Sequence, residues 1–338
     1  MRLKLKIAFF KIYLYKTIEL IRNTFPFIFM ELFYSLEQIK AHIEDSVVTI
    51  GNFDGVHKGH QALFNLTKKR ARIINSKSVA LTFNPHPLKL LQPEKTPLSI
   101  TTFEQKLNLI KSLNLDFILC LPFTKKLANV TADDFIKILV DTLKMKELVI
   151  GHDYAFGKGR KGSASFLKEA GKQYGFKVHH LKPVYDEDML ASSTAIRNLI
   201  IEGNMPLTKR LLGRNYRISG AVIHGMNRGG RLLGFPTANI VPQNELIPKS
   251  GVYAVYVIID DITYYGVTNI GVNPTFPERR FSIETHILDF MDNLEGKSID
   301  IIFVERIRSE QPFQGPDSLA FQIKLDIQKA REILSSDD

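Results

Sequence analysis

The stretch GNFDGVHKGH, residues 51–60, joins a β-branched run, SVVTIGNF at 46–53, to an apolar stripe of helical spacing at Leu63, Leu66 and Ile73. Gly55 and Gly59 allow a tight turn and a close approach of the backbone to a ligand. A helix beginning here presents free N–H groups that favour phosphate. The stretch therefore predicts a strand, an anion-binding loop and a helix start.

Two histidines, His57 and His60, lie three residues apart at this helix start and are expected to face the same side. Their N–H groups can donate hydrogen bonds to an anion. They could instead pack a tight turn or bind zinc. Zinc is the weaker alternative, because no further His/Cys cluster at ligand spacing is nearby.

Strand and helix patterns alternate outward from this stretch as far as residue 200. Strands are predicted at 78–83, 116–123, 147–151 and 176–184, with helices after a Thr101–Glu104 capping box, over 131–145 and from 163. Repeated units of this kind predict an α/β, Rossmann-like domain with a parallel sheet wrapped by helices. Its ligands are expected at the carboxyl ends of the strands.

The pattern changes beyond residue 214, where five strand-like runs are separated by Gly, Pro, Asn and Asp. Asp260-Asp261 is a candidate hairpin tip. The runs predict a small antiparallel β-barrel followed by a helix, capped near Asp317, with an apolar stripe at Leu319, Ile323, Ile327, Ala330 and Leu334. We expect domains at 30–205 and 212–336, with the boundary near 203–214 after a helix that ends at Gly203.

The net charge of +10 is unevenly distributed along the 338 residues, because half of it is in residues 1–29. The rest of the chain lacks the dense basic surface of a nucleic-acid-binding protein. Three interpretations of 1–29 stay open: a misassigned start before Met30, which we favour, a surface-lying amphipathic segment, or an unusual targeting sequence. No apolar run is long enough to span a membrane. The single cysteine, Cys120, is expected to be a core thiol in a reducing, cytoplasmic environment.

A second phosphate-binding candidate is SSTAIR, residues 192–197. The hydroxyls of Ser192, Ser193 and Thr194 can cap a helix or bond phosphate oxygens, and Arg197, one turn further, can bind them bidentately. Alone, this pattern is usually a plain helix cap. Together, the His-x-Gly-His stretch and SSTAIR resemble the nucleotidyltransferase superfamily that carries this signature.

The segments Pro85-His86-Pro87 and GHDYAFGKGRKG, residues 151–162, narrow the resemblance to bacterial FAD synthetases. This resemblance implies three sets of site residues. Flavin contacts fall on Pro85, His86, Pro87, Asp153 and Phe156; ATP contacts on Gly51, Phe53, Asp54, Gly55, Gly59, Ser192, Ser193 and Thr194; and adenylyl transfer on His57, His60 and Arg197. The acceptor, FMN, brings an ionised phosphate, so the reaction requires alignment and charge stabilisation but no general base.

The most distinctive segment of the sequence is GAVIHGMNRGGRLLGFPTAN, residues 220–239, whose five glycines surround Arg228 and Arg231. From the residues alone this is either a phosphate-binding loop or a glycine-rich barrel corner. With GVYAVYV, NIGVNPTF (269–276) and IETHILDF (283–290), it resembles riboflavin kinases. The resemblance implies that Thr237 and Asn239 hold Mg²⁺ with ATP, that Gly225, Arg231 and Gly234 also contact ATP, and that Glu284 activates the riboflavin 5′-hydroxyl. An alcohol, unlike a phosphate, needs such a proton acceptor.

The two resemblances together cover residues 30–335 and imply a bifunctional riboflavin kinase/FAD synthetase. Such an enzyme uses riboflavin, ATP and FMN as substrates, Mg²⁺ as cofactor, and FMN and FAD as products. One alternative is an HxGH nucleotidyltransferase for another phosphorylated acceptor with an accessory barrel. The other is an RNA-binding protein, which lacks support because no RNP-type aromatic strand motif is present. The sequence leaves the oligomeric state open.

Overall fold

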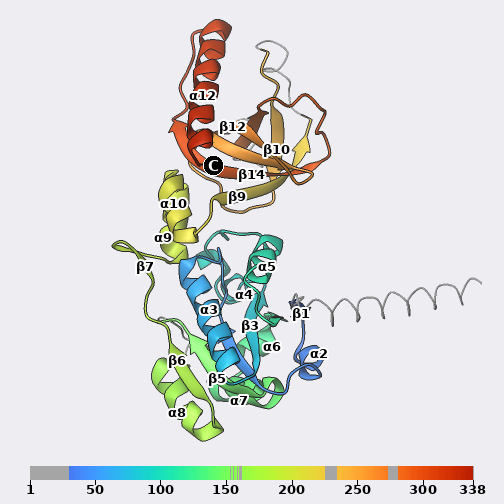
Figure 1. Cartoon of the computed structure of the whole chain (residues 1–338), viewed down its shortest axis with the longest axis vertical. Helices are drawn as coiled ribbons and strands as arrows, with labels where there is room; N and C mark the ends of the chain where they lie inside the picture. The colour runs from blue at the N-terminus through green and yellow to red at the C-terminus, as the bar shows by residue number, and fades with distance from the viewer. Residues whose placement is uncertain are drawn as a thin grey trace, which may run out of the picture.

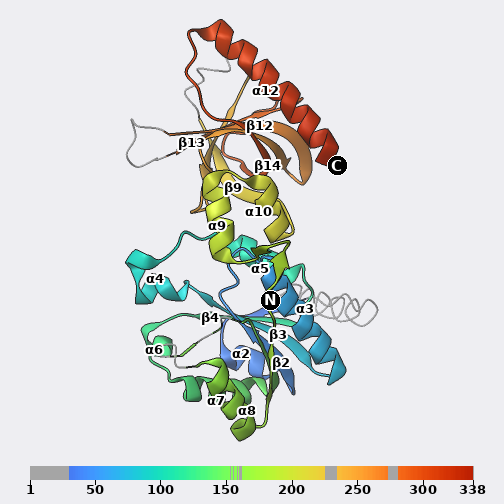
Figure 2. The same ribbon diagram turned by 90° about the vertical axis from the view of Figure 1, so that its left-hand side faces the viewer.

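The computed structural model describes residues 30–152, 154, 156, 157, 159, 162–224, 234–272 and 281–337. Figures 1 and 2 show an α/β domain and a β-barrel domain stacked along the long axis, with helices α9 and α10 between them. The expectations for residues 1–29, Asp153, Gly225 and Arg231 lie outside the described residues. In the part of the chain that the structure describes, no helix is long and apolar enough to cross a membrane.

The first domain is built on a parallel sheet in the order β1-β4-β3-β2-β5-β6. Its strands are β1 (Glu31–Phe33), β2 (Ser46–Ile50), β3 (Lys77–Asn84), β4 (Phe117–Pro122), β5 (Met145–Ile150) and β6 (Lys177–His180). From β2 the chain adds β3 and then β4 on one side of the sheet. It then crosses to the other side of β2, where it adds β5 and β6. This reversal places a topological switch point, where α/β sheets bind ligands, at the carboxyl ends of β2 and β5.

Helices cover both faces of this sheet, and its central strands β2, β3, β4 and β5 are largely buried. The helices α3 (Lys58–Ile73) and α5 (Phe103–Lys111) pack on one face through a cluster that includes Phe64, Ile110 and Ile118. The helices α2 (Leu36–Lys40), α7 (Ala132–Leu143) and α8 (Ala164–Tyr174) pack on the other. Shorter elements are α4 (Pro87–Leu91), η1 (Pro93–Lys95), α6 (Lys125–Ala128), β7 (Tyr185–Asp186) and β8 (Met189–Leu190).

The capping box predicted at Thr101 and Glu104 was wrong by one residue. Thr102 is the N-cap of α5, and it exchanges hydrogen bonds with Gln105. The Thr101 hydroxyl is not available as a cap, because it accepts from the Gly55 amide and lies within bonding distance of the Asp54 carboxylate. Cys120 is buried in β4, as predicted for a core thiol.

Two helices, α9 (Ser193–Glu202) and α10 (Met205–Leu212), connect the domains. Each ends at a glycine in the left-handed region: Gly203 has φ of 78° and Gly213 has φ of 73°. The predicted boundary near 203–214 therefore contains a helix rather than an open linker.

The second domain is a closed antiparallel barrel in the order β10-β13-β12-β11-β14-β9. Its strands are β9 (Tyr216–Ile223), β10 (Ala238–Pro242), β11 (Gly251–Ile259), β12 (Ile262–Val272), β13 (Phe281–Ile287) and β14 (Ser298–Arg308). Asp260 and Asp261 form the β11–β12 turn with φ of 48° and 65°, which matches the predicted two-residue hairpin.

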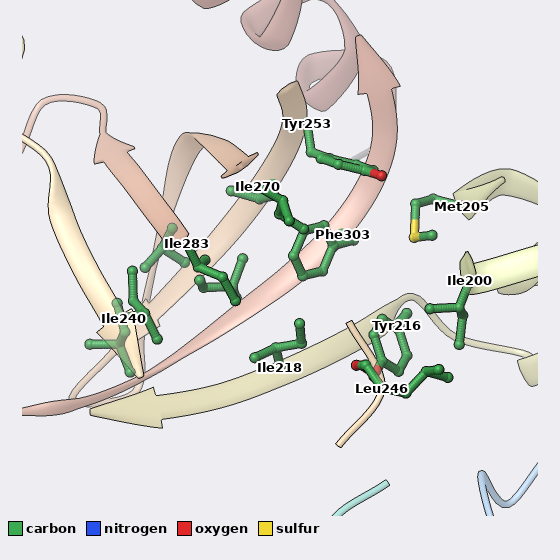
Figure 3. Close-up of a cluster of buried hydrophobic side chains, with 14 of the residues drawn as sticks. Ile200, Met205, Tyr216, Ile218, Ile240, Leu246, Tyr253, Ile270, Ile283 and Phe303 are labelled. Carbon is green, nitrogen blue, oxygen red and sulfur yellow. The ribbon is translucent and has the colours of Figure 1, made fainter. Parts of the chain in front are cut away.

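Figure 3 shows the core of the barrel, with Ile218, Ile240, Ile270 and Ile283 gathered inside it. Ile200 and Met205, from α9 and α10, pack at one end of the same cluster, beside Tyr216 and Leu246. The helix α12 (Pro316–Asp337) packs on the outside of the barrel through Ile327, Ala330 and Leu334. The barrel and the interdomain helices thus share one hydrophobic core.

Candidate active sites in both domains

The loop after β2 is held in a conformation that few side chains adopt. Phe53, Gly55 and Val56 have φ of 52°, 79° and 42°. Left-handed φ is costly for a β-branched residue such as Val56 and persists only where surrounding contacts enforce it. The loop ends at His57, the N-cap of α3, so these backbone angles set the position of the predicted histidine pair.

The His57 and His60 rings stack with their centroids 3.7 Å apart, and the edge of Phe53 packs against His60. Burial lowers the pKa of His60 well below its usual value, and the neighbouring His57 and Lys106 lower it further. Among the described residues the His60 Nδ1 has no hydrogen-bond partner. Burial therefore favours the neutral form of His60, and its Nδ1 stays available to a ligand.

Asp54 and Arg197 form a buried ion pair, with Arg197 Nη2 donating to Asp54 Oδ2 at 2.6 Å. The Asp54 carboxylate also accepts from the backbone amides of Ile100 and Thr101. Arg197 Nε donates to the Leu98 carbonyl at 2.8 Å. Asp54 and Arg197 together thus join the loop and SSTAIR to residues 98–101. Arg197 can contact a ligand only through its remaining N–H groups.

The SSTAIR segment begins α9 immediately beside the start of α3. A Cβ on Gly59 would lie only 3.1 Å from the Ala191 carbonyl, so glycine allows the two helix starts to approach. Ser192 caps α9 by accepting from the Ala195 amide, and the Ser193 hydroxyl donates to the Asp54 carbonyl. Thr194 is exposed. The structure brings together the two motifs predicted to bind triphosphate.

His86 lies beside the same loop, within 3.0 Å of the Asn52 amide group. Its Nδ1 accepts from the Leu88 amide at 3.2 Å and caps α4. Burial lowers the pKa of His86. By contrast, the Phe156 ring packs against Phe135 and Tyr154 in the core of the domain.

Lys106 of α5 was not predicted as a site residue. Its ammonium group lies 3.3 Å from the Asn52 carbonyl, the Thr82 hydroxyl and the Phe83 carbonyl, at the carboxyl ends of β2 and β3. Burial lowers the pKa of Lys106. The signal available in the sequence was its place on an otherwise apolar helix stripe with Phe103, Leu107 and Ile110.

The barrel carries the second site on three adjacent strands. Glu284 of β13 pairs with Asn239 of β10 on one side and with Asn269 of β12 on the other. Directly paired residues in antiparallel strands share a face, so the three polar side chains form a row. Ile283 and Thr285 are buried inside the barrel, which places this row on its outer face. Asn269 is a candidate site residue that strand patterning alone does not reveal.

Burial raises the pKa of the Glu284 carboxyl, and the negative charge of Glu310 raises it further. Thr237 precedes β10, two residues before Asn239, and both are half-buried. The Pro236 carbonyl lies 2.7 Å from His286 Nδ1, which ties the PTAN segment to β13. Gly234 has φ of 77° and is exposed. The PTAN segment, with Thr237 and Asn239, therefore lies against the strand that carries Glu284.

These features define a two-domain nucleotide-using transferase: an α/β domain with a His-x-Gly-His phosphate loop, and a small barrel with a carboxylate beside a Thr/Asn pair. Residues 39–195 match the family model of FAD synthetase, and residues 212–334 match that of riboflavin kinase. The chain belongs to the family of bifunctional riboflavin kinase/FMN adenylyltransferases.

Curated members of that family are similar over nearly their whole length. The enzyme of Escherichia coli K12 is 39% identical over 295 residues, which cover 87% of this chain and 94% of that protein. The enzyme of Buchnera aphidicola from Acyrthosiphon pisum is 39% identical over 302 residues, covering 88% and 96%. A Streptococcus pneumoniae crystal structure described as a macrolide-efflux protein has a TM-score of 0.79 at 33% identity, covering 89% of this chain and 99% of that one.

Proposed function

We propose that this chain phosphorylates the 5′-hydroxyl of riboflavin with ATP at the Asn239–Glu284–Asn269 row, and that it transfers AMP from ATP to FMN at the 51–60 loop, releasing pyrophosphate. The observation that carries the proposal is the difference between the two sites. The barrel site holds a carboxylate whose pKa is raised, whereas the loop site offers histidines, amides and cations around a helix start. The residues of the barrel site suit phosphorylation of an alcohol, and those of the loop site suit transfer of AMP to a phosphate.

In the kinase step, Glu284 accepts the proton of the 5′-hydroxyl as the oxygen attacks the γ-phosphorus of ATP. The bond from that phosphorus to the β,γ-bridging oxygen breaks, and ADP leaves. A raised pKa makes the Glu284 carboxylate a stronger base for this proton transfer. Asn239 and Asn269 flank its carboxylate and can orient it and the reacting groups. The assignments of Gly225 and Arg231 to ATP stay predictions, and so does that of Gly234.

Magnesium is the cofactor that the barrel residues fit. The Thr237 hydroxyl and the Asn239 amide oxygen are hard oxygen donors, and Mg²⁺ in kinases combines few protein ligands with substrate phosphates. The described residues hold no cluster of three or more His, Cys, Asp or Glu that would form a dedicated metal cage. When bound, Mg²⁺ would neutralise phosphate charge.

In the adenylyl transfer, the FMN phosphate attacks the α-phosphate of ATP without a general base. His57, His60 and the start of α3 face the triphosphate, Lys106 adds positive charge, and Asp54 with Arg197 holds the two motifs together. Gly51, Phe53, Gly55 and Gly59 shape the loop backbone around ATP, while Ser192, Ser193 and Thr194 supply hydroxyls. The flavin ring is assigned to Pro85, His86, Pro87, Asp153 and Phe156; for Phe156, its packing in the core favours an indirect role.

The test is incubation of the purified protein with riboflavin, ATP and Mg²⁺, followed by chromatographic separation of FMN and FAD. We expect both products, and neither in excess EDTA. Neither FMN nor FAD, with pyrophosphate released only when a different phosphorylated acceptor is supplied, would favour an HxGH transferase for another acceptor with an accessory barrel. A shift of RNA mobility with no flavin product would favour the RNA-binding alternative. A single buried cysteine and two ATP-dependent reactions suit a cytoplasmic enzyme.

A further inference from the structure

Arg214 lies between α10 and β9, inside the segment that matches riboflavin kinase, yet its hydrogen bonds reach the other domain. Its Nη2 donates to the Gly55 carbonyl at 2.7 Å, and its Nη1 lies 3.3 Å from the Val56 carbonyl. Both acceptors belong to the His-x-Gly-His loop. We propose that Arg214 is a positioning residue for FMN adenylylation, which holds the backbone immediately before His57 in its active conformation.

The loop needs such support because of its backbone geometry. Gly55 and Val56 both have positive φ, and this left-handed conformation is strained for a β-branched residue such as Val56. The planar guanidinium can bond two adjacent carbonyls at once, which fixes the orientation of both peptide units. Among the described residues, Arg214 is the only donor to the Gly55 carbonyl. Its removal would leave this strained turn weakly specified.

A second cross-domain contact acts on the same peptide. The Gln61 side-chain amide donates to the Val56 carbonyl at 2.9 Å and to the Leu212 carbonyl at 2.8 Å. Gln61 is on the first turn of α3, one residue beyond His60. Gln61 and Arg214 thus share two acceptors, the Val56 and Leu212 carbonyls, which join the end of α10 to the histidine loop.

The chemistry around Arg214 argues against a simple surface charge. No carboxylate of the described residues forms an ion pair with it, and its bonds go to carbonyl oxygens of Gly55, Val56 and Leu212. Burial lowers the pKa of Arg214 to about 10, with a smaller contribution from Arg217, so the group remains charged at neutral pH. A partly buried cation without a counter-ion is costly unless its N–H groups are hydrogen-bonded, and here the three carbonyls supply those bonds.

The inference rests on the proposed role of the 51–60 loop, so the test uses the full-length chain and measures each half-reaction separately. We expect Arg214→Ala to lower kcat for FAD formation from FMN by about 10- to 100-fold, as for a small misplacement of catalytic groups. FMN formation from riboflavin should change less than twofold. Arg214→Lys should recover part of the loss, because an ammonium group can bond one carbonyl but not both.

Arg217→Ala is the matched control, since Arg217 pairs with Asp300 within the barrel, and it should leave both reactions within twofold of the wild type. Hydrogen exchange of the peptide over residues 51–60 should accelerate in Arg214→Ala. If Arg214→Ala does not fold, Gln61→Met is measured in its place. It should lower FAD formation from FMN and leave FMN formation from riboflavin unchanged.

Equal loss of both half-reactions, or unchanged FAD formation with unchanged exchange, would overturn the proposal. Failure of the proposed function is distinguishable, because the wild type would then make no FAD, or His60→Ala would leave FAD formation intact.

Discussion

Asn239 of β10 lies directly opposite Glu284 of β13, although 44 residues separate them in the chain. This pairing joins the PTAN segment to the carboxylate that we assign as the kinase base. It gives the barrel site a rigid framework, because both residues are in strands of a closed barrel.

Glu284→Gln should reduce riboflavin phosphorylation about 100-fold or more, because the amide keeps the shape of the side chain but cannot accept the proton. FMN supplied directly should still become FAD. Steady-state rates of both half-reactions measure this. The exposed Glu305→Gln on β14 is the matched control and should change neither rate. A Glu284→Gln enzyme that keeps its kinase activity would refute the base assignment.

Glu310→Gln should lower the pKa of Glu284, because it removes a negative charge that now raises it. Glu284 must be ionised to accept a proton, so kinase activity is lost as pH falls through its pKa. The acidic limb of the kinase pH–rate profile should therefore move to lower pH in the variant. An unchanged limb, with kinase activity present, would show that the two carboxylates are not coupled.

The raised pKa also makes a prediction for stability. Folding disfavours the ionised form of Glu284, so its cost to stability is present at neutral pH and disappears at pH values below the pKa of the unfolded chain. Glu284→Gln should melt at a temperature equal to or above that of the wild type at pH 7, with the difference shrinking in acid. A variant that melts lower at pH 7 would contradict the sign of this shift.

His60→Ala should do the reverse of Glu284→Gln in activity. Loss of one donor at a site of phosphate charge costs about 100-fold, so FAD formation should fall while FMN accumulates from riboflavin. Lys106→Met should act in the same direction, and Lys111→Met, exposed on the same helix, is its control. Product ratios over time, with melting curves to confirm folding, decide the outcome. Equal damage to both reactions in a folded protein would refute the two-site assignment.

A fragment that keeps α9 and α10, residues 192–338, should be more stable than one that begins at 212. Ile200, Met205 and Leu211 pack in the barrel core, and removing such side chains costs about 2–5 kcal/mol each. Both fragments carry the kinase residues, so both should phosphorylate riboflavin wherever they remain folded. Urea unfolding of the two fragments compares their free energies. Equal stability would mean that the interdomain helices contribute nothing to the barrel.

The sequence by itself determined the two fold classes, the order of the domains and most of the candidate residues. Hydrophobic periodicity is a local property: the β-branched run at 46–50 and the Asp260-Asp261 turn each encode their own element. The motif residues His57, His60, Thr237 and Glu284 were found because glycine and hydroxyl patterns around a ligand are also local in the chain.

Only the tertiary structure decided which distant groups meet. Strand register places Asn269 beside Glu284. The packing of α5 on the sheet places Lys106 at the ends of β2 and β3. At the domain junction, Arg214 donates a hydrogen bond to the Gly55 carbonyl. The capping box moved from Thr101 to Thr102 because Asp54, 47 residues earlier, engages the Thr101 hydroxyl. Such contacts depend on the packing of whole elements, so no pattern within a short window of sequence specifies them.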